Sequence, residues 1–112
     1  MKKDIRIWLR DILKCVEEVE SYFDNRPRDF NFYLKDAMMR KAIERNLEII
    51  GEAMNRILKE EPTFAVANAR KIVDLRNTII HGYDVVNDAN IWSIVINHLP
   101  KLKEEVQKLL NE

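Results

Sequence analysis

The sequence predicts an all-α protein, folded as an antiparallel up-down four-helix bundle in one domain that spans residues 1–112. Apolar residues recur at spacings of three and four along four segments, which is the period of an amphipathic helix. Short polar or proline-containing breaks separate these segments and favour antiparallel neighbours, and no stretch alternates apolar and polar residues as a half-buried strand does. A chain of 112 residues with 46% hydrophobic side chains can fill one core and leaves no room for a second domain.

The first two helices are expected over residues 4–24 and roughly 30–59, on either side of a break at Pro27. Proline cannot continue the hydrogen-bond ladder of a helix and restricts the residue before it, so the first helix must end before this position. The second helix carries two apolar stripes, which predicts a central position in contact with more than one neighbour. The single Cys15 lies on the apolar face of the first helix and is expected to be buried.

The third helix is expected after a break at residues 60–63. Thr63 or Asn68 can cap its beginning, because both side chains accept hydrogen bonds from the backbone. Its end is predicted near His81, since Gly82 follows and glycine is the usual residue just past a helix C-terminus.

The fourth helix is expected after a turn-like connector at residues 84–88, with Asn87 or Asp88 as its cap. Pro100 falls inside the apolar pattern of this helix and should kink it by removing one hydrogen bond. His98 precedes this proline in the same pattern, which favours a structural or surface role for its imidazole.

The charge balance excludes a protein that binds nucleic acid through a broad basic surface. Lysine and arginine number 19, as do aspartate and glutamate, so any contact with RNA must be local. One cysteine cannot form an internal disulfide, which fits a reducing compartment. The charged N-terminus leads directly into an amphipathic pattern, and no apolar run approaches the length of a membrane span, so we expect a soluble cytoplasmic protein.

Four residues that can handle a phosphate or a proton fall between positions 76 and 83. Arg76 is a permanent cation, Asn77 donates and accepts hydrogen bonds, and His81 titrates near neutral pH. Tyr83 adds a hydroxyl and a flat ring. Five positions along an unbroken helix rotate a side chain by about 140°, so Arg76 and His81 would diverge unless the helix ends near His81 or a second copy of the chain completes the groove.

The sequence offers little for a metal or a phosphate-binding loop. His81 and His98 are seventeen positions apart, and the only glycines are Gly51 and Gly82. Neither a zinc-ligand spacing nor a glycine-rich loop is present, so a site without metal or cofactor is predicted.

An Arg-x4-His pair followed by Gly-Tyr at a helix end, in a small all-helical chain, resembles the HEPN superfamily and, within it, the HepT-like toxins. The segment Ala42–Ala53 (AIERNLEIIGEA) resembles the central helix of that family. This resemblance extends over nearly the whole chain and implies the HEPN-like helical fold.

The resemblance implies a metal-independent endoribonuclease toxin in which Arg76 and His81 are catalytic and Asn77 positions the scissile phosphate. It also implies RNA products with 2′,3′-cyclic phosphate ends and a cleft between the two protomers of a homodimer. The expected partner is a separate nucleotidyltransferase antitoxin of the MNT type, which modifies the tyrosine matching Tyr83 with AMP. Added phosphates beside Arg76 and His81 would fill the groove and neutralise its cation.

Interpretations without catalysis are also open. Arg45, Glu48 and Glu52 form a polar row on the second helix, either a shell that orients the motif or a solvated face with local ion pairs. Arg76 could be a structural ion-paired arginine, and His81 a helix-capping histidine. The whole chain could be a non-catalytic HEPN module that binds RNA or a nucleotide, or the helical subunit of a nucleotidyltransferase complex.

The apolar residues exceed what one small bundle readily buries. Two apolar stripes on the second helix, with Tyr33, Met38 and Trp92 as exposed candidates, predict a two-fold symmetric homodimer. Tryptophan and the other aromatic positions are more typical of a core or a dimer surface than of ligand contacts.

Overall fold

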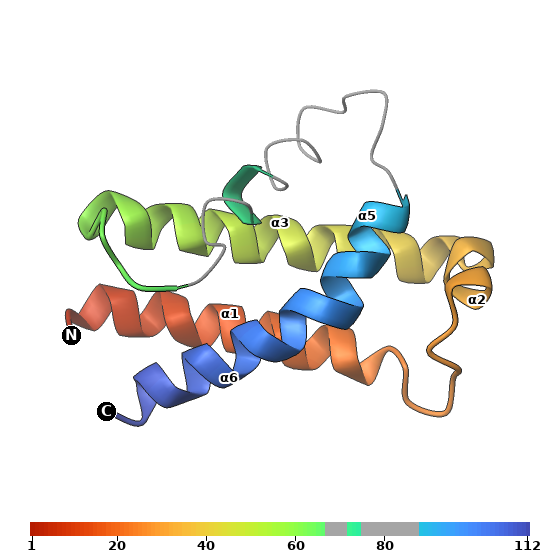
Figure 1. Cartoon of the computed structure of the whole chain (residues 1–112), viewed down its shortest axis with the longest axis horizontal. Helices are drawn as coiled ribbons and strands as arrows, with labels where there is room; N and C mark the ends of the chain where they lie inside the picture. Colours follow the sequence, from red (N-terminus) through yellow and green to blue (C-terminus); the bar gives the residue numbers. More distant parts are fainter. Residues whose placement is uncertain (67–71, 75–87) are drawn as a thin grey trace.

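The computed structural model describes residues 1–66, 72–74 and 88–112, and every regular element in these ranges is helical (Figure 1). The predicted all-α class is therefore confirmed for the described part of the chain. The elements are α1 (Lys3–Ser21), α2 (Phe30–Lys35), α3 (Ala37–Glu60), α5 (Asp88–Ser93), the π-helical segment η1 (Ile94–His98) and α6 (Leu99–Leu110).

The long helices α1 and α3 lie side by side and run antiparallel, and α6 crosses α1 from the other side (Figure 1). This arrangement follows from the amphipathic pattern, because α1 buries one stripe between α3 and α6 and leaves its charged face to solvent. Four helices in an up-down bundle, and a dimer of such bundles, remain predictions. None of the described helices combines the length and the apolar composition needed to cross a membrane.

The first helix ends three residues earlier than the predicted residue 24, at Ser21. The turn that follows tightens, with Asp24 N–H donating to the Ser21 carbonyl oxygen at 3.1 Å. Asn25 then adopts φ 61°, a left-handed conformation that asparagine tolerates better than most residues and that cannot continue the helix.

The prediction of one continuous helix over residues 30–59 was wrong, because Asp36 separates α2 from α3. Asp36 has an extended backbone, with φ −102° and ψ 92°, and its Oδ1 accepts a hydrogen bond from Met39 N–H at 3.0 Å. This is an N-cap, which satisfies one of the first backbone donors of α3 and lets α2 pack at a different angle.

The third predicted helix falls mostly outside the described residues, and only its turn at 72–74 is seen to be helical. Its predicted end near His81 and the candidate cap Asn68 lie outside that range. Thr63 occupies a turn in which Phe64 N–H donates to the Glu61 carbonyl oxygen at 3.0 Å.

The disturbance predicted at Pro100 takes the form of a wider helical turn. Leu99 N–H donates to the carbonyl oxygen of Ile94, five residues back, and the segment Ile94–His98 is π-helical. Pro100 follows in the first turn of α6, where a missing N–H is tolerated because the first donors of a helix have no partner within it. The fourth predicted helix is thus α5, η1 and α6 in succession, beginning at Asp88.

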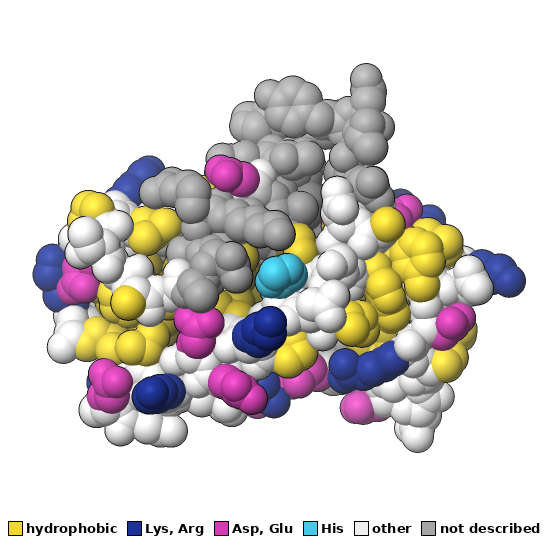
Figure 2. All heavy atoms as spheres, in the orientation of Figure 1, with side chains coloured by type: hydrophobic (Ala, Val, Ile, Leu, Met, Phe, Trp, Pro, Cys, Tyr) yellow, Lys and Arg dark blue, Asp and Glu magenta, His cyan; other side chains and the backbone are white. Residues whose placement is uncertain are grey.

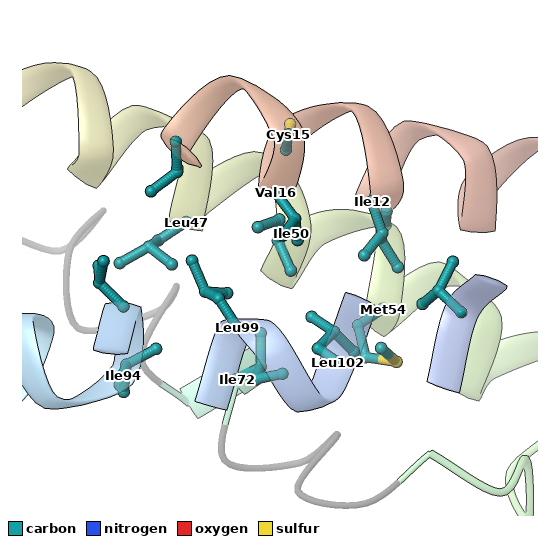
Figure 3. Packing of buried hydrophobic residues seen from close by; sticks show 14 of the residues in the cluster. Ile12, Cys15, Val16, Leu47, Ile50, Met54, Ile72, Ile94, Leu99 and Leu102 are labelled. Atoms are coloured by element: carbon teal, nitrogen blue, oxygen red, sulfur yellow. The ribbon is translucent and has the colours of Figure 1, made fainter. Parts of the chain in front are cut away.

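The core combines apolar side chains from every described helix, and Figure 3 shows how those of α1, α3 and α6 face one another. Cys15 is 4% exposed, as predicted for a buried cysteine. The largest fully buried side chains are Ile5, Leu9, Ile12, Val16, Val19, Tyr33, Ile43, Leu47, Ile50, Met54, Ile57 and Ile91.

The expectation that Tyr33 is exposed was wrong, because its side chain is fully buried. Its ring lies 5.2 Å from that of Trp92 on α5 and 6.3 Å from that of Phe30, in an aromatic cluster that joins α2 to α5. Trp92 is half-buried in the same cluster, and Trp8 is half-buried against the core. Met38, by contrast, is 83% exposed.

Candidate active site

The four side chains of the predicted motif, Arg76, Asn77, His81 and Tyr83, lie outside the described residues. Their catalytic, positioning and modification roles therefore remain predictions. The framework on either side of the motif, and the face of α3 predicted to support it, are described.

Both flanks of the motif are anchored in the core. On the N-terminal side, residues 72–74 form a helical turn, and Ile72 shares the buried cluster with Leu99 of α6 (Figure 3). On the C-terminal side, α5 begins at Asp88, and Ile91 one turn later is fully buried. The described residues on both sides of the motif thus include buried core positions.

An unusual polar cluster lies beside the first residue of α5. Burial raises the pKa of the Glu44 carboxyl, and the negative charge of Asp88 raises it further, against the opposing effect of Arg40. Burial also raises the pKa of the Tyr33 hydroxyl, with Asp88 and Glu44 adding to the effect. In the described part of the chain, this enclosed hydroxyl has no hydrogen-bond partner. The start of α5 is therefore close to two groups. One is the Tyr33 hydroxyl of α2, which has no hydrogen-bond partner among the described residues, and the other is the Glu44 carboxyl of α3, which retains its proton more readily than usual.

The predicted polar row on α3 forms local ion pairs among the described residues. Arg45 Nη1 lies 3.0 Å from Glu48 Oε2, and Arg56 Nη2 lies 2.7 Å from Glu52 Oε1. Such pairs on a helix surface contribute about 0.3–0.5 kcal/mol each. A further role of Arg45, Glu48 and Glu52 in orienting the motif stays a prediction. Glu44 was not predicted as part of this row, although its position one turn before Glu48 was an available signal.

A second polar cluster that sequence reasoning missed connects α1 to α3. Asn46 is 5% exposed and accepts a hydrogen bond from the Tyr22 hydroxyl at 2.6 Å. Its Nδ2 donates to Glu18 Oε1 at 3.2 Å, and its amide lowers the pKa of the Cys15 thiol. Burial nonetheless raises the pKa of that thiol above its ordinary value. The signal in the sequence was a lone amide within an otherwise apolar stripe of α3.

The described side chains contain no group of three or more His, Cys, Asp or Glu residues placed to hold a metal ion. His98 is half-buried at the end of η1. Charged side chains of both signs are interspersed over the face shown in Figure 2, in keeping with the 19 basic and 19 acidic residues of the whole chain.

The family model described as "Ribonuclease HepT-like" matches residues 12–109 of the chain. A protein of Methanocaldococcus jannaschii named "Putative RNase MJ1380" is 35% identical over 107 residues, covering 95% of this chain and 96% of the relative. "Probable ribonuclease HepT" of Thermococcus cleftensis is 31% identical over 110 residues, covering 97% and 98%. No solved structure gives a significant match.

A third relative is a longer protein. "Gamma-glutamylcyclotransferase and putative RNase MJ0434", also of Methanocaldococcus jannaschii, is 32% identical over all of this chain, which spans 50% of that relative's length. The family match over most of the chain, with relatives of similar length at comparable identity, is decisive. The chain belongs to the HepT-like ribonuclease family.

Proposed function

We propose that this protein is a metal-independent endoribonuclease that uses Arg76 and His81, and that it acts as the toxin of a toxin-antitoxin pair. The observation that carries the proposal is that the family match over residues 12–109 includes the whole Arg-x4-His-x-Tyr motif. RNA cleavage without a metal requires groups that move protons and a cation that stabilises the phosphorane, and His81 and Arg76 are side chains of these kinds.

The chemistry assigns each side chain a step. The 2′-hydroxyl of the RNA loses its proton and attacks the adjacent phosphorus, while the bond from phosphorus to the 5′-oxygen breaks and that oxygen gains a proton. His81 takes or gives one of these protons. Arg76 stabilises the charge that develops on the phosphorane, and Asn77 positions the phosphate. The product strand then carries a 2′,3′-cyclic phosphate.

The proposal includes a second protomer and a regulator. In a homodimer, two copies of the motif would face one cleft, which would remove the geometric conflict between Arg76 and His81 in a single helix. A separate nucleotidyltransferase antitoxin would transfer the AMP group of ATP to the Tyr83 hydroxyl, with loss of the hydroxyl proton and release of pyrophosphate. The added negative charge would pair with Arg76 and block the phosphate position.

The described feature that we assign to support of the motif is the acidic face of α3. Glu44, Glu48 and Glu52 lie on half-buried positions of α3. Asp88 is close enough to Glu44 to raise the pKa of its carboxyl. We propose that this acidic face of α3, with Arg45, orients the motif side chains.

The test is incubation of the purified protein with single-stranded RNA in the presence of a chelator. Cleavage by the parent should survive the chelator and fall at least about a hundredfold in Arg76→Ala and in His81→Ala, because one group that stabilises transition-state charge contributes roughly 3 to 4 kcal/mol. His98→Ala is the matched control and should cleave like the parent. Binding of RNA without cleavage would instead indicate a non-catalytic helical module.

A further inference from the structure

An open hollow of ≈ 280 Å³ lies between the end of α1 and the beginning of α3, lined by Tyr22, Arg26, Asp36, Met38, Met39 and Ala42. We call it the α1–α3 hollow. Figure 1 shows that these two helix ends lie together at the end of the molecule that carries α2. The hollow is open to solvent and somewhat smaller than the usual site for a drug-sized ligand, about 300–1,000 Å³, so it suits one flat group.

One wall of the hollow is an aromatic ring held in place. The hydroxyl of Tyr22 donates to Asn46 Oδ1 at 2.6 Å, and Asn46 is 5% exposed and donates in turn to Glu18. This buried network fixes the tip of the tyrosine, while its ring is half-buried and lines the hollow. A ring fixed by buried hydrogen bonds is a preorganised stacking surface, because little side-chain entropy is lost when a partner binds.

The rim of the hollow carries an apolar side chain in solvent. Met38 is 83% exposed, the highest exposure of any large apolar side chain among the described residues. Its thioether is flexible and polarizable and packs favourably against aromatic rings. A flat aromatic group between Tyr22 and Met38 would cover the apolar surface of both side chains.

Basic side chains lie in the lining of the hollow and along α3 beyond it, where Arg45 is paired with Glu48. Arg26 lines it, and one of its guanidinium nitrogens, Nη1, donates to the Tyr22 carbonyl oxygen at 3.1 Å, which leaves other N–H groups for a ligand. Lys41 and Arg45 follow Met38 by three and seven residues, so they extend along the same exposed face of α3. Asp36 is the one carboxylate in the lining, and its Oδ1 is occupied by the N-cap hydrogen bond to Met39.

We propose that the α1–α3 hollow is a subsite for single-stranded RNA, in which one base stacks on Tyr22 and adjacent phosphates bind Arg26 and Lys41. The inference deepens the proposed function, on which its choice of ligand rests. A fixed aromatic surface beside a track of cations is how proteins bind single strands with little sequence preference. The lining holds one cation and one carboxylate, Arg26 and Asp36, and the exposed Lys41 on the adjacent face of α3 adds the positive charge that favours a polyanion over a second copy of the chain.

Binding is measured on the cleavage-deficient His81→Ala protein, by fluorescence anisotropy with a labelled oligoadenylate of about eight nucleotides, a length within the range of known single-strand sites. Tyr22→Leu, which keeps apolar bulk but removes the ring, should weaken binding about tenfold. Tyr22→Phe keeps the ring and should bind more tightly than Tyr22→Leu, with a smaller loss of affinity that reflects the missing hydrogen bond to Asn46. Lys59→Ala, at the opposite end of α3, is the control for loss of one exposed cation.

Two surface variants keep the test independent of folding, because both side chains are exposed. Met38→Glu should weaken binding by placing a negative charge at the rim. Arg26→Ala should weaken it and reduce the slope of log affinity against log salt by about one, as expected for one lost phosphate contact. Helical circular dichroism of each variant should match that of the parent.

The proposal is overturned if the His81→Ala protein binds no oligonucleotide, or if adding Tyr22→Leu or Met38→Glu to it leaves the affinity unchanged. It is also overturned if Met38→Glu changes a dimer to a monomer in light scattering while RNA affinity is unchanged, since the hollow is then a protein interface. Binding that depends on the hollow in a parent protein that never cleaves RNA would leave this inference standing and refute the proposed function.

Discussion

Removing the hydroxyl group from Tyr33 and from Tyr22 is the same chemical change, but the structure predicts opposite effects on stability. The Tyr33 hydroxyl is enclosed and has no hydrogen-bond partner among the described residues. The Tyr22 hydroxyl is part-buried and donates to Asn46 at 2.6 Å. One substitution therefore removes a cost of burial, and the other removes a stabilising contact.

The magnitudes follow from the two environments. An unpartnered buried hydroxyl costs about 1–3 kcal/mol relative to water, so Tyr33→Phe should raise the free energy of unfolding by about 1 kcal/mol after allowance for relaxation. Tyr22→Phe removes a hydrogen bond of about 1 kcal/mol and leaves the buried Asn46 oxygen unpaired, so it should lower the free energy of unfolding by about 1–2 kcal/mol.

Urea denaturation followed by far-ultraviolet circular dichroism measures both changes, provided that the dependence of the unfolding free energy on urea has the same slope in all proteins. The melting temperatures should move in opposite directions, by about 4 °C for each kcal/mol in a chain of this size. A loss of stability in Tyr33→Phe as large as that in Tyr22→Phe would refute the reasoning, because it would mean that the Tyr33 hydroxyl is hydrogen-bonded.

Two further predictions concern regulation and pH. Co-expression with the cognate nucleotidyltransferase should add AMP to Tyr83 and silence cleavage, while Tyr83→Phe should escape silencing; peptide mass spectrometry that finds AMP elsewhere, or none despite full neutralisation, contradicts the mechanism. Glu44 has a pKa above its ordinary 4.5 in the folded protein, so its protonated form stabilises the fold below that pH and this contribution is lost as pH rises. Glu44→Gln should therefore be more stable than the parent at neutral pH and lose that advantage in acid. Urea denaturation across pH measures this, with Glu104→Gln on the exposed surface of α6 as the control. If Glu44→Gln has no advantage at neutral pH, the assigned burial of Glu44 is contradicted.

The helices were predictable where apolar residues recur at the helical period over many turns. The helical period located α1, α3 and α6 because their apolar residues pack on neighbours along their whole length. The break at Asp36 was not predicted, because apolar spacing continues across it and one side-chain hydrogen bond decides between a continuous helix and two. The spacing of apolar residues therefore does not indicate that the helix breaks at Asp36.

The exposure of aromatic residues could not be predicted from local pattern. Tyr33 is buried because Trp92, 59 positions later in the chain, packs 5.2 Å away from it. Pairing at this sequence separation depends on how α5 returns across α2, which a local apolar pattern does not encode. Met38, by contrast, is 83% exposed and was correctly expected on the surface.

For the candidate site, the sequence indicated which side chains can react, and the structure showed the surroundings of some of the side chains on α3. Residue types indicated what Arg76 and His81 can do chemically, the family resemblance implied that they are catalytic, and the family match covers both positions. The buried amide of Asn46 and the raised pKa of Glu44 were not predicted, since each arises from burial and from neighbours on other helices. A sequence pattern identifies groups that can react, but not the environment that sets their protonation.

The most direct test of the central claim is the chemical nature of the RNA ends. A short RNA is incubated with the protein and a chelator, and the products are identified by intact mass; a matched oligonucleotide with 2′-deoxy sugars serves as the control. The account predicts 2′,3′-cyclic phosphate ends from the RNA, no cleavage of the deoxy oligonucleotide, and no cyclic product from His81→Ala. Cleavage of the deoxy control, or 5′-phosphate ends that disappear with the chelator, would contradict it.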